Sequence, residues 1–520
     1  MISFSNAITY SGIGTFSPDS QYFAISKSLD VIIYNSSTLK QVQKFSFCDF
    51  IENVQWSPDS TMIMVGLYKR GLIEIKQVRK PKWICRVDEG MEGISYGRFT
   101  PNSQNVLIYC QNHTKLFIRS LNNKSKKIIY LPKYEKKGID FSNLKNFMVI
   151  CTKKNAKDMI EIYYTQTWDL VNKFESSSED LQNVLFTHDL LSIIISDAFY
   201  IYKLLIYSLS GDLIKVIEPY KYKLGIRLSK ITPNGHYLII GCFDHIIRVY
   251  NTVAFTSVCE FDHYPNLKSD KVNYYFEEDI PKKNGESHFI HLNPPINLTY
   301  KNAHPTDKNI KKGIRNFCIS EDSLFIASKD DSIGNVIFIW ELVTLNLHSV
   351  IILKNEVTNF AWAPNMNCLY ICSETSKVYL FKMDSISVIE LPSNFYTQSV
   401  VLSKDGRKVI LKDLNNFILM NFGVGENYFT FEPRKYNNTY NQREIEEDDE
   451  NAQTNLARKG DEDQYYDDNN GHYDNYDENN NYNNNYNNNY NNNYEGNNYG
   501  EEGEMNPQGT FNNQNNNSNQ

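Results

Sequence analysis

Trp56-Ser57-Pro58-Asp59-Ser60 is the stretch of sequence that decides the fold, because near-copies of it recur along most of the chain. The proline presets φ for the second position of a tight turn, and the aspartate side chain can close the turn onto its own backbone. An apolar run at residues 62–65 follows directly. The stretch is therefore typical of an aromatic strand end, a turn and the start of the next strand. A single match of this kind would indicate only a hairpin.

Nine copies of this turn can be aligned, and their first residues are Phe16, Trp56, Phe99, Phe141, Phe186, Ile231, Ile319, Trp362 and Leu402. The intervals between them are 40, 43, 42, 45, 45, 88, 43 and 40 residues. A period of about 40–45 residues, with about four short strands in each unit, is the signature of a WD-repeat β-propeller. We therefore predict an all-β fold, with a propeller over residues 1–432. Nine turns favour nine blades, and seven or eight blades, or two smaller propellers, are the alternatives.

The third strand of each unit can also be located, about 15–20 residues after each turn. In WD repeats this strand ends in the dipeptide that names the family. Trp340-Glu341 resembles it, and Tyr250-Asn251, Tyr34-Asn35 and Tyr207-Ser208 resemble it more weakly. Asp244, and Asp330 or Asp331, match the structural aspartate of the repeat. We expect the N-terminal strand, residues 2–10, to lie beside residues 417–422 and to close the ring.

One interval is double, and it holds an insertion at about residues 262–312 that contains five prolines. The prolines favour a loop insertion, with one or two strands near residues 289–291 and 296–300. A tenth, decayed blade is the alternative. Propeller loops of this kind usually lie on a binding face, so the insertion is a candidate contact for a partner.

The charge of the chain is divided unevenly. Residues 433–520 hold 5 Lys+Arg and 18 Asp+Glu, whereas residues 1–432 hold 48 and 43. The end of the chain alternates asparagine, tyrosine and acidic residues, and it cannot bury enough apolar area to offset its chain entropy. We predict a disordered low-complexity tail at residues 433–520. It is either a drifting extension or an interaction tail.

Cysteine usage and hydropathy bear on the cellular compartment. The nine cysteines are odd in number and have no Cys-x-x-Cys pair, which favours reduced thiols. We find no basic and apolar leader, and no apolar stretch near the roughly 20 residues that span a bilayer. These features lead us to expect a cytosolic or nuclear protein.

Motifs for catalysis are missing from the sequence, including a P-loop, a Gly-x-Ser-x-Gly elbow and His-Glu-x-x-His. We therefore predict no enzymatic activity, no catalytic residues and no cofactor. His288, His291 and His304 could in principle meet around a metal. A loop offers them neither fixed geometry nor outer-shell support, so we expect no metal site.

Lysine clusters occur at residues 124–127, 133–137, 153–157 and 221–223. Lysines often keep blade edges soluble and discourage edge pairing. The alternative is a positive surface for an acidic partner such as a tubulin tail or RNA. The small excess of basic residues in 1–432 argues against a dedicated nucleic-acid binder.

Several short sequence motifs outside the turns carry a more specific resemblance to a known protein family. They are Tyr68-Lys69-Arg70-Gly71-Leu72, Trp83-x-Cys85-Arg86-Val87-Asp88-Glu89-Gly90, Trp168 before Asp180-Leu181, residues 203–211, Leu224-Gly225-Ile226 and Lys312-Gly313-Ile314. In their order, over about residues 1–430, the chain resembles the centrosomal and spindle-pole WD-repeat protein family (WD-repeat protein eight, antisense-to-p73 type). The fourth and fifth turns lack the proline, and the tail has no counterpart in that family. The first motif, at residues 68–72, could simply shape a hairpin.

This resemblance implies a non-enzymatic scaffold at the centrosome or spindle pole, where it would help to anchor microtubule minus ends. It also implies a role in spindle or cilium assembly. The implied partners are a coiled-coil centrosomal anchoring protein and a minus-end kinesin, with no specific nucleic acid and no membrane. Which residues contact a partner stays unknown at this level. A translation-initiation-associated propeller is the alternative, and a hydrolase hidden in the central channel is a weaker third.

Overall fold

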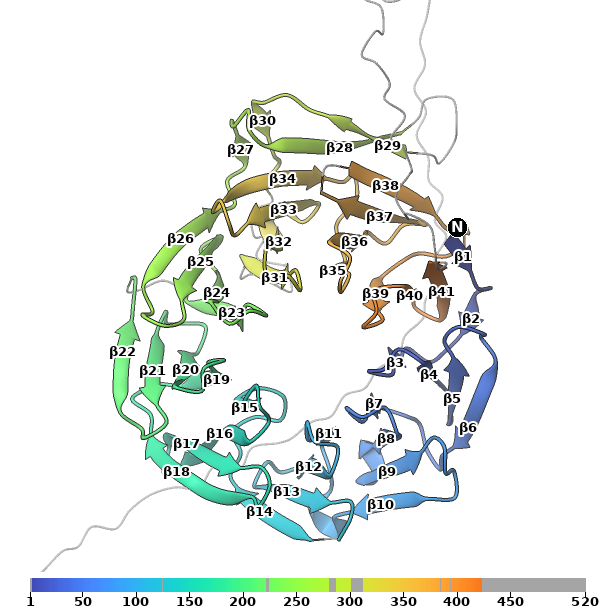
Figure 1. Cartoon of the computed structure of the whole chain (residues 1–520), viewed down its shortest axis with the longest axis vertical. Helices are drawn as coiled ribbons and strands as arrows, with labels where there is room; N and C mark the ends of the chain where they lie inside the picture. The colour runs from blue at the N-terminus through green and yellow to red at the C-terminus, as the bar shows by residue number, and fades with distance from the viewer. Residues whose placement is uncertain are drawn as a thin grey trace, which may run out of the picture. The chain divides into compact units, whose positions relative to one another are not determined.

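A computed structural model describes residues 2–123, 125–220, 224–279, 287–300, 312–383, 385–392 and 394–422. Across these ranges the chain forms β-strands and three single-turn 3-10 helices, η1 (Tyr68–Arg70), η2 (Gly90–Glu92) and η3 (Asp331–Ile333), with no α-helix. Nine sheets stand radially around one centre, as Figure 1 shows. The predicted all-β WD-repeat propeller is confirmed, and it has nine blades. The predicted tail at residues 433–520 lies outside the described residues.

In blades 1 to 8 four antiparallel strands run in chain order from the centre of the ring to its rim, and in blade 9 three such strands are completed by the N-terminal strand. Blades 1 to 3 are β3 (Gly14–Phe16), β4 (Tyr22–Lys27), β5 (Asp30–Asn35), β6 (Gln41–Ser46); β7 (Asn53–Trp56), β8 (Met62–Leu67), β9 (Leu72–Gln77), β10 (Ile84–Asp88); and β11 (Tyr96–Phe99), β12 (Asn105–Tyr109), β13 (Lys115–Ser120), β14 (Lys126–Tyr130). Blades 4 to 6 are β15 (Ile139–Phe141), β16 (Phe147–Lys154), β17 (Lys157–Tyr164), β18 (Asp169–Glu175); β19 (Leu181–Phe186), β20 (Ser192–Asp197), β21 (Leu204–Ser208), β22 (Leu213–Ile217); and β23 (Ile226–Ile231), β24 (Tyr237–Cys242), β25 (Ile246–Asn251), β26 (Ser257–Asp262). Blades 7 to 9 are β31 (Ile314–Ile319), β32 (Phe325–Asp330), β33 (Val336–Glu341), β34 (Asn346–Ile352); β35 (Asn359–Trp362), β36 (Cys368–Cys372), β37 (Lys377–Lys382), β38 (Ser385–Glu390); and β39 (Ser399–Leu402), β40 (Lys408–Lys412), β41 (Asn416–Phe422).

The ring is closed by strands from opposite ends of the described chain. β1 (Ile2–Phe4) and β2 (Ile8–Thr9) both pair antiparallel with β41, with Ile2 opposite Phe422 and Ile8 opposite Phe417. The ring of Phe417 meets those of Tyr10 and Phe23 edge-on at 5.7 and 5.8 Å, so aromatic packing joins blade 9 to blade 1. The predicted closure beside residues 417–422 is confirmed.

The nine sequence copies are the turns between the first and second strands of the nine blades. After β7, Asp59 Oδ1 accepts a hydrogen bond from the Thr61 backbone N–H at 3.1 Å, as the sequence predicts. A second hydrogen bond closes the same turn, because the Ser57 hydroxyl accepts from the Met62 N–H at 2.9 Å. A hydroxyl makes this bond in eight of the nine turns, which all lie within the described residues: at Ser17, Ser57, Thr100, Ser142, Thr187, Thr232, Ser320 and Ser403. In the remaining turn, Ala363 occupies the position of the hydroxyl residue, so that turn lacks this hydrogen bond.

The core lies between the faces of neighbouring blades. Leu107 and Tyr109 of blade 3, for example, pack with Met148 and Ile150 of blade 4, and all four are at most 1% exposed. Burial of apolar side chains at each interface removes them from water and joins the blades into one ring. The cysteines are all free thiols, and five of them are buried.

The WD-like dipeptide takes a structural place in blade 7. The indole N–H of Trp340 donates to the Ser328 hydroxyl at 2.9 Å, and that hydroxyl lies 2.7 Å from Nε2 of His263. Asp330 is fully buried and accepts from the Ser332 N–H at 2.7 Å, so it, and not Asp331, occupies the buried structural position. Asp244 forms an ion pair with Arg248 at 2.7 Å.

The insertion between blades 6 and 7 extends a blade. β28 (Asn273–Asp279) and β29 (Ser287–His291) form an antiparallel hairpin, and β28 pairs in parallel with the outer edge of β34. β27 (Asn266–Leu267) and β30 (Ile296–Asn297) form a second, short pair. In Figure 1 the hairpin lies outside β34 at the top of the ring.

The expectation of a mostly looped insertion is therefore wrong over residues 273–279, and the tenth-blade alternative is wrong as well. The expected strand near residues 289–291 is present as β29, whereas only Ile296–Asn297 of the second is a strand. The physical reason is local composition, since Tyr274 and Tyr275 are strong strand formers that become 1% and 2% exposed. Burial of these rings against blades 7 and 8 outweighs the effect of the surrounding prolines.

Candidate protein-interaction surface

The sequence motif at residues 68–72 has a structural role. Tyr68 and its neighbours form η1 in the turn between β8 and β9, and Gly71 has φ 65°, a left-handed conformation that glycine adopts without strain. The Tyr68 hydroxyl accepts hydrogen bonds from Asn53 Nδ2 at 3.0 Å and from the Gly97 N–H at 3.2 Å. It thereby joins blade 2 to blade 3, and the hairpin explanation is correct.

Two glycine-containing sequence motifs allow close contacts between neighbouring blades. Gly225 and Gly313 each precede the first strand of a blade, against the backbone of the blade before it. A Cβ on Gly225 would lie 2.1 Å from the carbonyl oxygen of Ile201, and one on Gly313 would lie 2.7 Å from Cα of Phe243. These positions require glycine because neighbouring blades pack closely there. The two motifs therefore have a packing role and do not mark a partner site.

The histidines considered for a metal do not converge among the described residues. His288 and His291 are three residues apart on β29, so they point to opposite faces of the strand. His291 packs on the ring of Tyr275 at 4.6 Å, whereas His288 lies 3.8 Å from Glu278. His304 lies outside the described residues, and no group of three His, Cys, Asp or Glu side chains with metal-site spacing occurs in the part that the structure describes.

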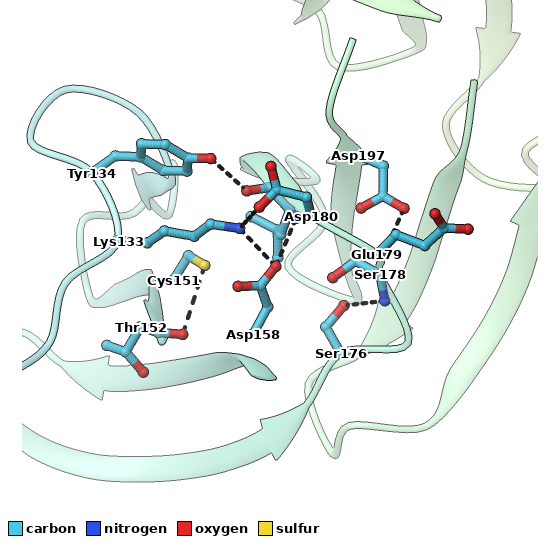
Figure 2. A network of polar contacts seen from close by, with 11 residues as sticks. Lys133, Tyr134, Cys151, Thr152, Asp158, Ser176, Ser178, Glu179, Asp180 and Asp197 are labelled. Atoms are coloured by element: carbon cyan, nitrogen blue, oxygen red, sulfur yellow. Dashed lines mark hydrogen bonds and ion pairs between the residues drawn. The ribbon is translucent and has the colours of Figure 1, made fainter. Parts of the chain in front are cut away.

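One predicted lysine cluster holds a buried ion-pair network, shown in Figure 2. The Lys133 side chain is 7% exposed, and its Nζ lies 2.7 Å from Asp158 and 2.6 Å from Asp180. Asp158 also accepts from the Leu181 N–H at 2.7 Å, and the Tyr134 hydroxyl donates to the Leu181 carbonyl at 3.0 Å. Burial alone would lower the pKa of Lys133, but the two carboxylates raise it. Lys133 therefore joins blades 4 and 5 and is not available to a partner.

Asp197 lies beside this network and provides a pH-dependent prediction. It is 1% exposed, and its Oδ2 accepts from the Glu179 N–H at 3.2 Å, while burial raises its pKa to about 6. Because an unfolded aspartate titrates near pH 3.9, the folded chain binds more protons here between about pH 4 and 6. The contribution of Asp197 to stability is therefore greatest in acid and is lost as the pH rises through 6.

We expect Asp197→Asn to raise the free energy of unfolding by up to about 2 kcal/mol near pH 7 and to have little effect near pH 4, because asparagine cannot ionise. Urea unfolding of both proteins at several pH values measures this difference. An equal difference at every pH would contradict the assignment, since a purely steric or hydrogen-bonding effect does not depend on protonation.

A second lysine cluster lies at the end of an unusually long hairpin. β16 and β17 have eight residues each, whereas the second strands of the other blades have five or six. Asn155 and Ala156 have φ of 50° and 62° and form the two-residue tip, as expected for a type I′ turn. The hairpin carries Lys153 and Lys154, both exposed, at its end. Of the other two clusters, Lys124 and residues 221–223 lie outside the described residues.

Exposed apolar side chains gather on β14, β18 and β22, the outer strands of blades 3, 4 and 5. These strands follow the rim from the bottom to the left of Figure 1. The side chains are 40 to 62% exposed: Ile128, Tyr130, Leu170, Val171, Leu213, Ile214 and Val216. The outer strands β26 and β38, over their described residues, carry no exposed large apolar side chain. Clustered apolar exposure of this kind marks interaction sites more often than scattered single residues do.

A groove between β14 and blade 4 joins these two features. It has a volume of about 300 Å³, and we call it the rim groove. Tyr130, Leu131 and Leu170 contribute its apolar walls, and Lys153 and Lys154 also line it. The lysines were predictable from the sequence as one alternative, whereas the apolar walls were missed, although the run Ile128-Ile129-Tyr130-Leu131 indicates an apolar rim strand next to a basic cluster.

Comparisons with known proteins find WD-repeat proteins that are similar to this chain. No protein-family model matches the chain. The Mus musculus WD repeat-containing protein WRAP73 is 27% identical over 411 residues, which cover 75% of this chain and 89% of that protein. An uncharacterized WD repeat-containing protein of Schizosaccharomyces pombe is 21% identical over 372 residues, covering 66% of this chain and 72% of that protein. Among solved structures, the C-terminal WD40 domain of Sif2 has a TM-score of 0.46 at 10% identity and covers 81% of this chain and 99% of that chain.

WD-repeat propellers generally bind protein partners through a rigid ring whose loops and edges vary. No helix in the described part of the chain has the length and apolarity of a membrane span. The recurring turns and the nine-bladed ring show that this chain is a WD-repeat propeller, a scaffold for protein interactions, and its sequence is similar to that of WRAP73.

Proposed function

We propose that this protein is a non-enzymatic scaffold at the centrosome or spindle pole, in the cytoplasmic cytoskeleton, that helps to anchor microtubule minus ends during spindle or cilium assembly. The observation that carries the proposal is the similarity to WRAP73 over 75% of the chain, which supports the family resemblance seen in the sequence. The proposed partners are a coiled-coil centrosomal anchoring protein and a minus-end kinesin.

The surface chemistry supports a protein partner. The rim of blades 3 to 5 exposes aliphatic and aromatic side chains on a rigid sheet, where a partner can bury them without reordering the propeller. The buried Lys133 network and the close glycine contacts fix neighbouring blades, so the rim is presented in one shape. A rigid surface reduces the entropy lost on binding.

The proposal is tested by tagging the protein fluorescently in dividing cells and identifying co-purifying proteins. We expect signal at the spindle poles and recovery of a coiled-coil protein. The double variant Tyr130→Ser/Leu170→Ser should reduce that recovery, whereas the control Leu144→Ser, in a central turn and 68% exposed, should not. Diffuse signal without a coiled-coil partner contradicts the proposal, and co-sedimentation with ribosomes would favour the translation alternative.

A further inference from the structure

We propose that the rim groove binds an extended, acidic segment of a partner protein, with apolar side chains of the segment on the groove walls and its carboxylates at Lys153 and Lys154. The inference rests on the proposed scaffold function and specifies the chemistry of the partner. Three independent features of the described residues support it: unpaired charge, exposed apolar area and open strand edges.

The charge around the groove is distributed unequally. Five lysines near it already pair with carboxylates of this chain: Lys126 with Glu89, Lys127 with Asp169, Lys133 with Asp158 and Asp180, Lys157 with Glu175, and Lys173 with Glu161. Lys153 and Lys154 are exposed, and no carboxylate of the described residues lies within ion-pair distance of either. They therefore offer positive charge, next to the apolar walls, that no carboxylate of the described residues neutralises.

The carboxylate on the groove floor does not oppose an acidic ligand. Glu161 is 5% exposed and accepts hydrogen bonds from the Tyr163 hydroxyl at 2.6 Å and the Thr152 hydroxyl at 3.1 Å, besides its ion pair with Lys173. Its charge is therefore satisfied within blade 4. The walls above it are open, because Tyr130, Leu131 and Leu170 are 62, 45 and 50% exposed.

The extended conformation of the partner follows from the sheet edges. β14 and β18 are the last strands of their sheets, so their outer backbone edges are unpaired within these sheets. Blade 7 shows what such an edge accepts in this propeller, since β28 pairs in parallel with β34 from Asn273 opposite Ser349 to Phe276 opposite Ile352. Addition of a strand to an open edge is a common mode of peptide recognition, in which main-chain bonds add affinity.

Fluorescence polarisation with the full-length protein tests the inference. The probe is a short labelled peptide in which glutamate and valine alternate, and two control peptides carry glutamine or lysine in place of glutamate. We expect the glutamate peptide to bind most tightly and to weaken as salt rises, because exposed charges are screened. Lys153→Glu/Lys154→Glu should weaken it by about tenfold or more.

The matched control is Lys268→Glu/Lys271→Glu, which changes the net charge equally at exposed lysines near β28 and should leave the affinity within about twofold. Equal losses in the two double variants, or equal binding of the lysine peptide, would overturn the inference. Tyr130→Ser/Leu170→Ser provides a second test that leaves the charge unchanged. The two proposals fail separately: peptide binding without spindle-pole signal contradicts only the cellular role, and spindle-pole signal without peptide binding contradicts only the acidic ligand.

Discussion

Replacing Lys133 with methionine should lower the free energy of unfolding by about 3–5 kcal/mol, because it leaves a buried carboxylate without its cation. Asp158 is 4% exposed and lies 2.7 Å from Lys133 Nζ, and its Oδ2 would keep only the Leu181 N–H as a partner. Asp180 is less affected, since its side chain is 37% exposed and water can solvate it. Urea unfolding of the variant and the parent protein measures the loss.

A double variant and a control separate the buried charge from lost packing. Lys133→Met/Asp158→Leu removes both charges, so it should recover much of the stability that the single variant loses. Lys137→Met, at an exposed position in the same cluster, should change stability by less than about 0.5 kcal/mol. If the single and double variants were equally unstable, the unpaired Asp158 charge would not be the cause.

Gly225→Ala should destabilise the ring by about 3 kcal/mol or more, because the added methyl group would meet backbone atoms that cannot turn aside. It would lie 2.1 Å from the Ile201 carbonyl oxygen and 2.4 Å from the carbonyl carbon. Any shift also strains two bonds, from the Gly225 N–H to Phe199 at 2.7 Å and from the Phe243 N–H to Gly225 at 3.3 Å. The loss would appear as a lower midpoint of urea unfolding.

Gly14→Ala is the matched control for this substitution. Its new Cβ would meet only side-chain atoms of Lys412, Ile25 and Tyr10 at 3.6 to 4.0 Å, which is ordinary van der Waals contact. The expected change is less than about 1 kcal/mol. A Gly225→Ala protein as stable as the Gly14→Ala protein would show that blades 5 and 6 can separate locally at little cost.

The repeated turns were predictable from sequence because their chemistry is local. Asp59 closes its turn through an N–H two residues away, and Ser57 through an N–H five residues away. Both hydrogen bonds therefore lie within one short segment of the sequence. Copies without the proline still work, since the turn at Ser142 keeps the bond to the Phe147 N–H at 3.0 Å. Repetition of such words at a fixed interval was enough to predict a propeller.

The insertion and the rim groove were not predictable in the same way, because they depend on contacts between distant segments. β28 is held by β34, more than 70 residues further along the chain, and nothing in its own sequence identifies that edge. Similarly, Tyr130 and Leu170 come from different blades, and the lysines between them in sequence divide into paired and unpaired ones only in three dimensions. Lys133 and Lys153 belong to similar clusters, yet one is buried and the other exposed.

Closure of the ring by β1 on β41 has a mechanical consequence for a tether. The two strands are antiparallel with Ile2 opposite Phe422, so a pulling force applied between these two residues peels the pairing apart one bond at a time. Peeling loads each hydrogen bond singly, whereas a force applied across a blade is shared by many bonds. In the proposed tethering role, tension is therefore best carried through attachments on the blades, with the two strand ends left free of load.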